Sequence, residues 1–236
     1  MKKTEVFQSA LLADVAHLVH GYSSRSFGDM QNSEMRARFA ESLGLDSTPL
    51  KKPKQVHGNK VAFVHEIDTD SIVADVDGLV SNGRQLCVIT ADCVPMLAVD
   101  PKIRVIGAAH AGWKGTIGGI AKNLIDMMVE KGADKKTVRV SIGPYIGLCC
   151  YNVPFDRAQQ FRKKFGENGI VKKINDAWHI DIGQANVRDL QGVGILEENI
   201  DLFDLCTSCN SKSLFSYRKD SQESYGEMVG IIGWKN

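Results

Sequence analysis

The sequence predicts a fold that mixes helices and β-strands around mixed sheets, in an α+β or α/β arrangement. Three features favour it: near-continuous apolar strands in the middle of the chain, strands that follow one another like hairpins, and helices interspersed between them. The chain has 236 residues, of which 43% are hydrophobic and 24% charged, enough for one large buried core. No Pro-, Gly- or Ser-rich linker and no repeat divides it, so we expect a single domain over residues 1–236.

The first third of the chain is predicted to contain a helix and a short strand. Residues 34–43 are expected to be helical because Met35, Phe39 and Leu43 fall on one face, and a glycine follows where a helix should end. The apolar residues 61–64 are expected to form the short strand.

The middle of the chain carries the clearest pattern. A helix is predicted over residues 117–131, where apolar side chains form one stripe and Gly132 follows the last turn. The strands around it are near-continuously apolar, which is typical of a sheet covered on both faces. We expect these strands at residues 86–90, 94–99, 104–109 and 138–142.

The last third of the chain repeats the mixture. Helices are expected around residues 155–165 and 184–191, and late strands at residues 201–206, 213–217 and 228–234.

Charge and cysteine content narrow the possible partners. The net charge is +1, so no basic field favours nucleic acid or an anionic membrane as a partner. No signal-peptide core follows the N-terminus, and the longest apolar run is too short to span a bilayer, so we expect a cytoplasmic protein. The six cysteines are then reduced thiols rather than a disulfide framework. We expect the Cys206/Cys209 CxxC to be structural and the Cys149–Cys150 pair to pack in the core.

Three separate segments each offer one metal ligand: His57, Cys93 and His110. Two imidazoles and one thiolate match the three protein ligands that a catalytic zinc ion takes, with the fourth position left for water or substrate. Small residues around His110 leave room beside its imidazole, and Trp113 and Lys114 add an aromatic face and a positive charge. The alternative is that both histidines are ordinary loop residues and that Cys93 is a small buried side chain.

Five motifs occur in order along the chain and together resemble one family. They are Lys54-Gln55-Val56-His57-Gly58, Asp77-Gly78-Leu79-Val80, Thr90-Ala91-Asp92-Cys93-Val94-Pro95, Ala109-His110-Ala111-Gly112-Trp113-Lys114-Gly115 and Ile142-Gly143-Pro144-Tyr145-Ile146-Gly147. As a set they resemble the laccase-domain family, also called multicopper polyphenol oxidoreductases or YfiH-like proteins. The resemblance runs from about residue 18 to the C-terminus.

The resemblance implies an α+β fold, a four-layer α/β/β/α sandwich with mixed β-sheets in a single domain. It implies a zinc site of His57, Cys93 and His110, which would also be the catalytic residues. Members of the family are purine nucleoside phosphorylases, with adenosine deaminase and methylthioadenosine phosphorylase activity, and the older name reports a copper-dependent oxidation of phenols. The partners would be small molecules: phosphate and a purine nucleoside such as adenosine, inosine, guanosine or methylthioadenosine, cleaved to the base and ribose 1-phosphate.

The chain also departs from the family pattern. The arginine that we assign to phosphate corresponds to Arg25, but the family motif S-T-R-x-G-G has become Ser-Ser-Arg-Ser-Phe-Gly here, and the loop after it is much shorter. In the motif that resembles S-x-R-R-D-G-x-T-G-R, Glu227 replaces the last arginine. Asn152 stands where many members have glutamate.

Two reactions need different groups. A zinc-bound water has a lowered pKa and is suited to attack C6 of adenosine and release ammonia. Phosphorolysis needs phosphate near C1′ of the ribose, and Arg25, Lys114 and Arg218 are the cations available to bind it. The alternative for each of these cations is solvated surface charge.

Three other functions remain open from the sequence. Two histidines and a cysteine also suit type 1 copper in a phenol oxidase, although six histidines are too few for an additional trinuclear cluster. Cys93 is a candidate nucleophile of a cysteine hydrolase, with either histidine as base. A binding protein that uses zinc structurally is the third possibility. The oligomeric state is not predicted.

Overall fold

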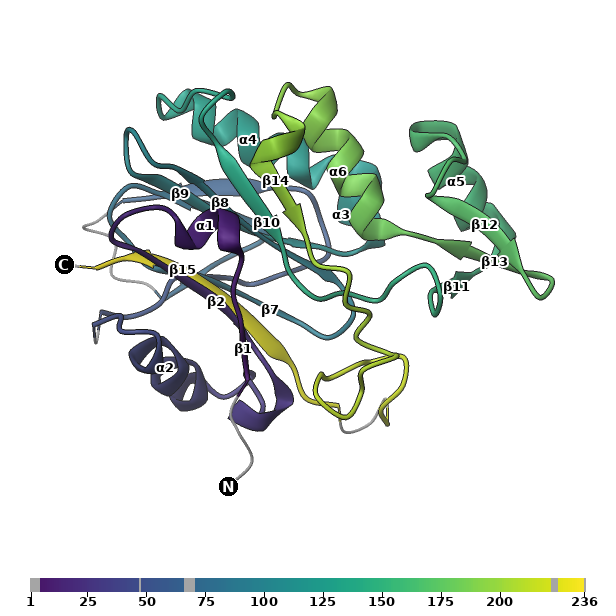
Figure 1. The fold of residues 1–236 in the computed structure, drawn as a ribbon, viewed down its shortest axis with the longest axis horizontal. Helices are drawn as coiled ribbons and strands as arrows, with labels where there is room; N and C mark the ends of the chain where they lie inside the picture. The colour runs from purple at the N-terminus through teal and green to yellow at the C-terminus, as the bar shows by residue number, and fades with distance from the viewer. Residues whose placement is uncertain (1–4, 47, 66–70, 222–224, 236) are drawn as a thin grey trace.

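The computed structural model describes residues 5–46, 48–65, 71–221 and 225–235. They form a mixed α/β fold with several sheets (Figure 1). Short 3₁₀ turns lie at Arg25–Phe27 and Glu197–Asn199. The α-helices are α1 (Ala10–Ala13), α2 (Ser33–Ser42), α3 (Trp113–Gly118), α4 (Ile120–Glu130), α5 (Phe155–Phe165) and α6 (Ile182–Gly192).

Two large sheets dominate the fold. The six-stranded sheet is mixed, with parallel pairs at both ends and antiparallel pairs between them. Its order is β14 (Ile200–Leu202), β10 (Arg139–Ile142), β8 (Val94–Asp100), β9 (Val105–Ala111), β6 (Gly78–Ser81) and β4 (Val61–Val64). The four-stranded sheet is antiparallel, in the order β1 (Val6–Phe7), β2 (Leu18–Ser23), β15 (Met228–Trp234) and β7 (Leu86–Thr90).

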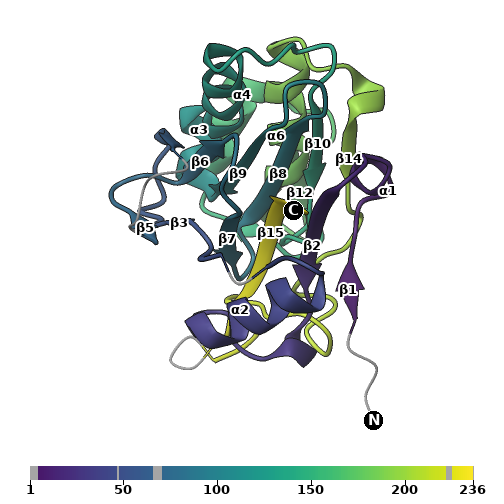
Figure 2. The same cartoon turned by 90° about the vertical axis from the view of Figure 1, so that its left-hand side faces the viewer.

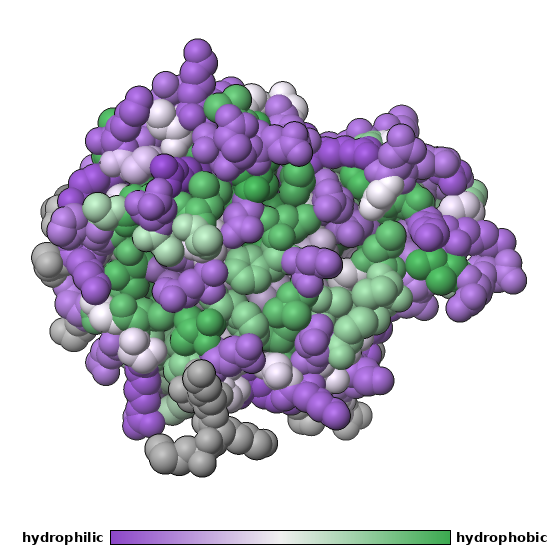
Figure 3. Space-filling model, in the orientation of Figure 1, coloured by the Kyte–Doolittle hydropathy of each residue, from purple (hydrophilic) through white to green (hydrophobic). Residues whose placement is uncertain are grey.

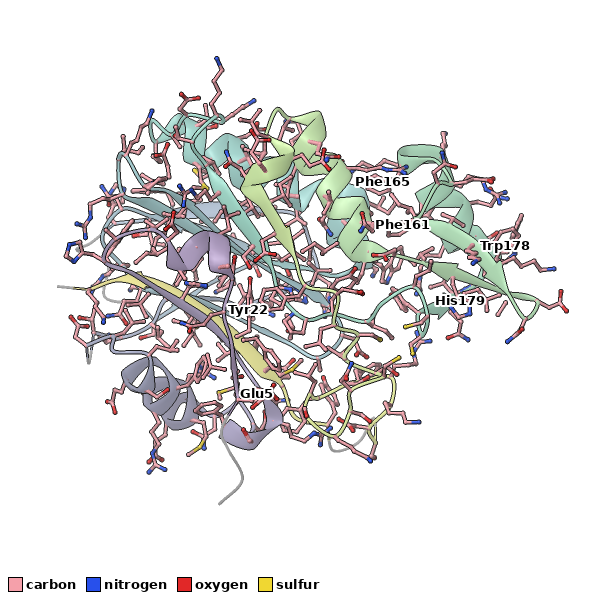
Figure 4. The ribbon with its side chains drawn as sticks, in the orientation of Figure 1. Glu5, Tyr22, Phe161, Phe165, Trp178 and His179 are labelled. Atoms are coloured by element: carbon pink, nitrogen blue, oxygen red, sulfur yellow. The ribbon has the colours of Figure 1, made fainter. Side chains whose placement is uncertain are left out.

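Two smaller sheets lie beside them. An antiparallel three-stranded sheet has the order β11 (Asn152–Val153), β13 (Ala177–Ile180) and β12 (Val171–Ile174). Helix α5 packs on it, and Phe161 and Phe165 of that helix join the buried cluster that also contains residues of α6 (Figure 4). The strands β3 (Lys52–Pro53) and β5 (Ile72–Val73) form a parallel pair.

Three buried apolar clusters hold these elements together. The first lies between the six-stranded sheet and the helices α4, α5 and α6. The second lies between the two large sheets, and the third lies between the four-stranded sheet and α2. Figure 2 shows α2 on the side of the molecule opposite α3, α4 and α6. Both large sheets are therefore covered on both faces.

Strand β8 shows why the middle of the chain is so apolar. All of its residues are buried. Val94, Met96 and Ala98 belong to the cluster on the helix side, while Leu97 and Val99 belong to the cluster between the sheets. Successive side chains of a strand point to opposite faces, so a strand buried on both faces needs apolar residues at nearly every position.

Most of the predicted elements are confirmed, with three differences. The helix predicted over 117–131 is two helices, because Gly119 has a left-handed backbone with φ of 81° and separates α3 from α4. The strand predicted over 201–206 ends at Leu202. The strand predicted over 213–217 was wrong, because its backbone groups are used in local turns: Leu214 N donates to Asn210 O, and Ser216 O accepts from two later amides.

No helix within the described ranges is both long enough and apolar enough to cross a bilayer. Figure 3 shows apolar residues grouped in the centre of one face, with hydrophilic residues around them.

Tyr22 links the two large sheets. It lies on β2, is 1% exposed, and its hydroxyl donates to the carbonyl of Ser141 on β10 over 2.9 Å. The hydroxyl of Ser141 lies 3.0 Å from the same oxygen. The ring packs edge-on against Phe203, with the centroids 5.6 Å apart. One side chain thus joins the four-stranded sheet to the six-stranded sheet through both an apolar and a polar contact.

We expect Tyr22→Phe to lower the free energy of unfolding by about 1–2 kcal/mol, because it leaves buried groups of Ser141 without their partner. Urea unfolding measures the change. The control is Tyr217→Phe, at a tyrosine that is 42% exposed, where we expect a change within about 0.5 kcal/mol. Equal effects of the two substitutions would contradict the role of the Tyr22 hydroxyl.

Candidate metal centre

The structure brings the three predicted ligands together. One ligand atom from each of His57, Cys93 and His110 lies within 4.8 Å of the others. The rings of the two histidines meet edge to face, with their centroids 4.8 Å apart. His110 is buried, Cys93 half-buried and His57 exposed. The group is therefore open to solvent from the side of His57.

The register of the six-stranded sheet accounts for most of this convergence. Strands β8 and β9 pair with Val94 opposite Ala111, so Cys93, just before β8, lies across from the residue that follows β9. Strands β6 and β9 pair with Gly78 opposite Ala109, which places Asp77 opposite His110. The amide of His110 accordingly donates to the carbonyl of Asp77 over 2.8 Å.

Asp77 fixes the third ligand. Its carboxylate is fully buried and accepts hydrogen bonds from the amides of Val56, His57 and Gly58 over 3.2, 2.9 and 2.7 Å. One of its oxygens also lies 2.9 Å from Nδ1 of His110. A buried carboxylate on Nδ1 leaves Nε2 of that imidazole for a metal and fixes the orientation of the ring. Asp77 belongs to one of the five motifs, but its sequence context alone predicts no role for it.

The bonds to Asp77 also set its charge. Burial alone raises the pKa of this carboxyl, but the bonds from His110 and from the amides of Gly58 and Val56 outweigh burial and lower the pKa below its ordinary value. Asp77 is therefore a carboxylate that supports positive charge at His110.

The backbone is strained at the same place. Gln55, His57 and Asp92 have φ values of 56°, 58° and 84°, in the left-handed region where residues other than glycine lose about 1–3 kcal/mol each. Such strain is held only where other contacts fix the chain. Asp77 fixes the 56–58 loop, and Asp92 accepts bonds from the hydroxyl of Thr207 over 2.5 Å and the amide of Arg218 over 2.7 Å.

Gly112 provides the space inside the ligand group. A Cβ at this position would lie 2.9 Å from Nδ1 of His57 and 3.3 Å from Sγ of Cys93. Any larger residue would therefore displace a ligand. The motif Ala-Gly-Trp that follows His110 is explained by this close approach.

Cys93 and His110 shift each other's pKa. Burial raises the pKa of the Cys93 thiol, but His110 and His57 more than offset burial and lower it to about 7. Burial lowers the pKa of His110, while the Cys93 thiolate and Asp77 raise it to about 9. Without a metal, the Cys93 thiol is therefore about half ionised near pH 7, beside a protonated His110.

A cavity of about 420 Å³ opens on one side of the ligand group. Its walls combine aromatic and cationic side chains. Lys114, Arg157 and Arg218 bring positive charge, and Trp113, Tyr151 and Tyr217 bring aromatic rings. The guanidinium of Arg157 stacks over Trp113 at 4.1 Å, and that of Arg218 lies 5.3 Å from the centre of Tyr151.

A second cavity, of about 540 Å³, opens on the other side. His57, Cys93 and Tyr217 line both cavities, so the ligand group lies where they meet. The second cavity is lined by Lys52 and Glu227 among other polar residues. Burial raises the pKa of Glu227 above its ordinary value, and the positive charge of His110 opposes that rise.

Two of the three predicted phosphate ligands line a cavity beside the metal centre, and the third does not. Lys114 and Arg218 line the 420 Å³ cavity. Arg25 lines neither cavity: it forms a 2.5 Å ion pair with Asp220, donates to the carbonyl of Leu214 and stacks 4.2 Å above Phe215. Its role in binding phosphate stays a prediction.

Arg157 is the cation that sequence reasoning missed. It lies in the first half of α5, and no motif surrounds it. Its buried Nε has no hydrogen-bond partner among the described residues. Only the packing of α5 against Trp113 brings it to the cavity, so no signal in the sequence marks it.

Comparisons with known proteins identify the family of this chain. The model of the family described as multi-copper polyphenol oxidoreductase laccase matches residues 24–235. The chain is 35% identical over 209 residues to a purine nucleoside phosphorylase from Deinococcus radiodurans, covering 85% of this chain and 76% of that protein. It is 34% identical over 210 residues to adenosine deaminase RL5 from an unknown prokaryotic organism, covering 84% of this chain and 80% of that protein.

The fold agrees with these relatives. The crystal structure of YlmD from Geobacillus stearothermophilus superimposes with a TM-score of 0.85 at 27% identity, covering 97% of this chain and 94% of that one. A mixed α/β fold with several sheets, the largest of them mixed, is thus confirmed, and so is the resemblance that the five motifs indicated. The chain belongs to the multi-copper polyphenol oxidoreductase laccase family, the laccase-domain or YfiH-like proteins.

Proposed function

We propose that this protein is a zinc-dependent purine nucleoside phosphorylase with adenosine deaminase activity. The observation that carries the proposal is the position of His57, Cys93 and His110 between two cavities, one of them rich in cations and aromatic rings. Relatives named purine nucleoside phosphorylase and adenosine deaminase support it. The catalytic residues of the proposal are these three side chains.

The donor set fits zinc. Two imidazoles and one thiolate leave one position open, as in catalytic zinc sites, and the carboxylate of Asp77 on Nδ1 of His110 is the usual outer partner of a zinc-bound imidazole. Gly112 keeps the space between the three donors free of side-chain atoms. Zinc in such a site polarises a substrate oxygen and lowers the pKa of a water.

The chain's own residues bind phosphate in this proposal. Lys114, Arg157 and Arg218 line one cavity beside His57 and Cys93. Arg218 donates to the backbone and side-chain oxygens of Asn152, which is neutral, so the positive charge of Arg218 is not cancelled there. The orphaned Nε of Arg157 is a donor without a partner. Guanidinium groups bind phosphate oxygens in pairs, which positions the phosphate for attack on a neighbouring ribose.

Aromatic side chains are suited to hold the nucleoside. Tyr217 is 42% exposed, unusual for so large a ring, and lines both cavities next to the metal ligands. It meets Tyr225 edge to face at 5.0 Å, which restrains its ring. A purine that stacks on Tyr217 would lie across the opening between the cavities and exclude water from the ligand group.

The copper alternative lacks a second histidine site. His20 lies 2.9 Å from the amide of Ser9, His179 bonds the carbonyl of Leu148, and His65 packs against Phe63. Among the described residues, the only other group able to hold a metal consists of cysteines. The donors of a histidine-rich trinuclear cluster are therefore not brought together by the residues described.

A cysteine hydrolase is the second candidate, and one observation favours it. Cys93, His110 and Asp77 form a thiolate–imidazolium–carboxylate series, which is the arrangement of a cysteine nucleophile with its base and the group that orients the base. The second imidazole, His57, has no role in such a series but completes a metal site. Zinc dependence therefore separates the two candidates.

The direct test is chromatography of products after incubation of zinc-loaded protein with adenosine, with and without phosphate. We expect adenine and ribose 1-phosphate only with phosphate, and inosine in both samples. His57→Ala should lose turnover by more than the roughly 10–100-fold that loss of an outer partner of a metal ligand costs. His65→Ala, at an exposed histidine outside the centre, should keep wild-type turnover. If metal-free His57→Ala protein formed these products as fast as the wild type, the result would contradict the proposal.

The shifted pKa of Cys93 predicts how its thiol reacts. In metal-free protein we expect iodoacetamide to modify Cys93 with a midpoint near pH 7, two units below the ordinary value of 9, because thiolate is the reacting form. Bound zinc should suppress the reaction. Mass spectrometry of the peptide that contains Cys93 measures both effects. A midpoint near pH 9, or modification unaffected by zinc, would contradict the ligand assignment, and a turnover that zinc inhibits would favour the hydrolase.

Arg157→Gln tests the phosphate ligands. Loss of one charge-assisted bond costs about 1.5–3 kcal/mol, so we expect the KM for phosphate to rise roughly 10- to 100-fold with little change in the KM for the nucleoside. The matched control is Arg162→Gln on the same helix, whose guanidinium pairs with Glu167 outside the cavity. Equal effects of the two changes on the phosphate KM would refute the role of Arg157.

A further inference from the structure

Four cysteines that the proposed reaction does not use lie together outside the metal centre. One sulfur atom from each of Cys149, Cys150, Cys206 and Cys209 lies within 4.8 Å of the others. Sγ of Cys209 is 3.5 Å from that of Cys149 and 3.4 Å from that of Cys150. None of the four forms a disulfide. Two sequence-distant pairs therefore converge on one point.

The spacing of the sulfurs suits a single tetrahedral ion. A Zn–S bond of about 2.3 Å in a tetrahedron separates neighbouring sulfurs by roughly 3.8 Å, and the separations here lie between 3.4 and 4.8 Å. A disulfide needs about 2.05 Å. An iron–sulfur cluster would place several metal atoms between the thiolates and needs a wider group.

The four cysteines lie at the edge of the core and not inside it. Cys149 and Cys209 are exposed, and Cys150 and Cys206 are half-buried. The expectation that this pair packs in the core was therefore wrong for Cys149, whereas the half-buried Cys150 packs against the first apolar cluster. Exposed free thiols are prone to oxidation, and of the four only Cys150 and Cys206 gain apolar contact, against the first cluster. A bound ion explains why they converge.

Contacts other than those among the four sulfurs also position both segments. Tyr145 and Cys206 form an isolated parallel bridge, and the amide of Gly147 donates to Sγ of Cys206 over 3.3 Å. An amide bonded to sulfur is a common second partner of a metal-bound thiolate. Nδ1 of His179 lies 2.8 Å from the carbonyl of Leu148, which fixes the turn that carries the first pair. In Figure 4, sulfur atoms lie near the labelled His179.

We propose that Cys149, Cys150, Cys206 and Cys209 bind one structural zinc ion. Four thiolates fill the coordination sphere and leave no position for water or substrate, which distinguishes this site from the centre at His57. Each thiol releases its proton when the ion binds, so the site is stronger at neutral than at acidic pH.

The zinc ion would hold a segment that otherwise has little regular structure. Residues 203–221 contain turns but no helix or strand. Thr207, next to Cys206, bonds the carboxylate of Asp92, and Asp92 precedes the ligand Cys93. The same segment carries Tyr217 and Arg218 into the cavities. The ion thus fixes a wall of the proposed active site without touching substrate.

The test is the zinc content of the purified full-length protein by mass spectrometry of the metal. We expect two zinc ions per chain in the wild type, one in Cys209→Ser and one in His57→Ala. Cys87→Ala, at a buried cysteine outside both groups, should keep two. Cys209→Ser reports on the four-cysteine site and His57→Ala on the centre at His57. Failure of this proposal is therefore distinguishable from failure of the proposed function.

A second measurement does not depend on the folding of any cysteine variant. X-ray absorption at the zinc edge of His57→Ala should show sulfur neighbours alone, at about 2.3 Å. Wild-type protein with a single zinc ion that Cys209→Ser retains would overturn the proposal. Iron in place of zinc, or a native mass 2 Da lower for each disulfide formed among these cysteines, would also overturn it.

Discussion

The fold of this site depends on one buried carboxylate. Asp77 lies opposite His110 in the six-stranded sheet, so the pairing of β6 with β9 sets its place. From there it accepts hydrogen bonds from three amides of the 56–58 loop and orients the His110 ring. A carboxylate buried without these bonds would be strongly unfavourable. The sheet register, the loop conformation and the imidazole orientation are therefore a single interdependent arrangement, and the left-handed backbone of His57 is held by it.

A second carboxylate organises the other side of the centre. The Asp92 carboxylate accepts hydrogen bonds from the Thr207 hydroxyl and the Arg218 amide. Its backbone carbonyl accepts a hydrogen bond from the amide of Ile146. These bonds join the start of β8 to the loop before β11 and to the segment between β14 and β15. The cysteines proposed to bind the second ion lie in the same two segments. The walls of the cavities are thus built from irregular chain that is fixed by side-chain bonds instead of by a strand ladder.

The charges on the two sides of the ligand group differ. The cavity lined by Lys114, Arg157 and Arg218 has three cations and suits an anion, whereas the other cavity combines Lys52 and Lys54 with the carboxyl of Glu227. Because that carboxyl offsets part of the lysines' charge, the phosphate site is proposed on the Arg157 side. Arg25, which the family pattern suggested for phosphate, is paired with Asp220 of the segment 203–221. This ion pair and the contacts of Arg25 with Leu214 and Phe215 suit a role in fixing that segment.

The sequence by itself determined the local elements and the three candidate metal ligands. Continuous apolar runs placed β4 and β7 at their observed bounds, and the helix expected around residues 155–165 matches α5. The five motifs marked His57, Cys93 and His110. Only the tertiary structure decided which charges face the site, since Arg157, Asp77 and Glu227 reach it through strand register and helix packing between distant segments. It also converted two unremarkable cysteine pairs, at 149–150 and 206–209, into one group of four. Contacts between residues far apart in the chain leave no periodic pattern, so no local pattern in one sequence reveals them.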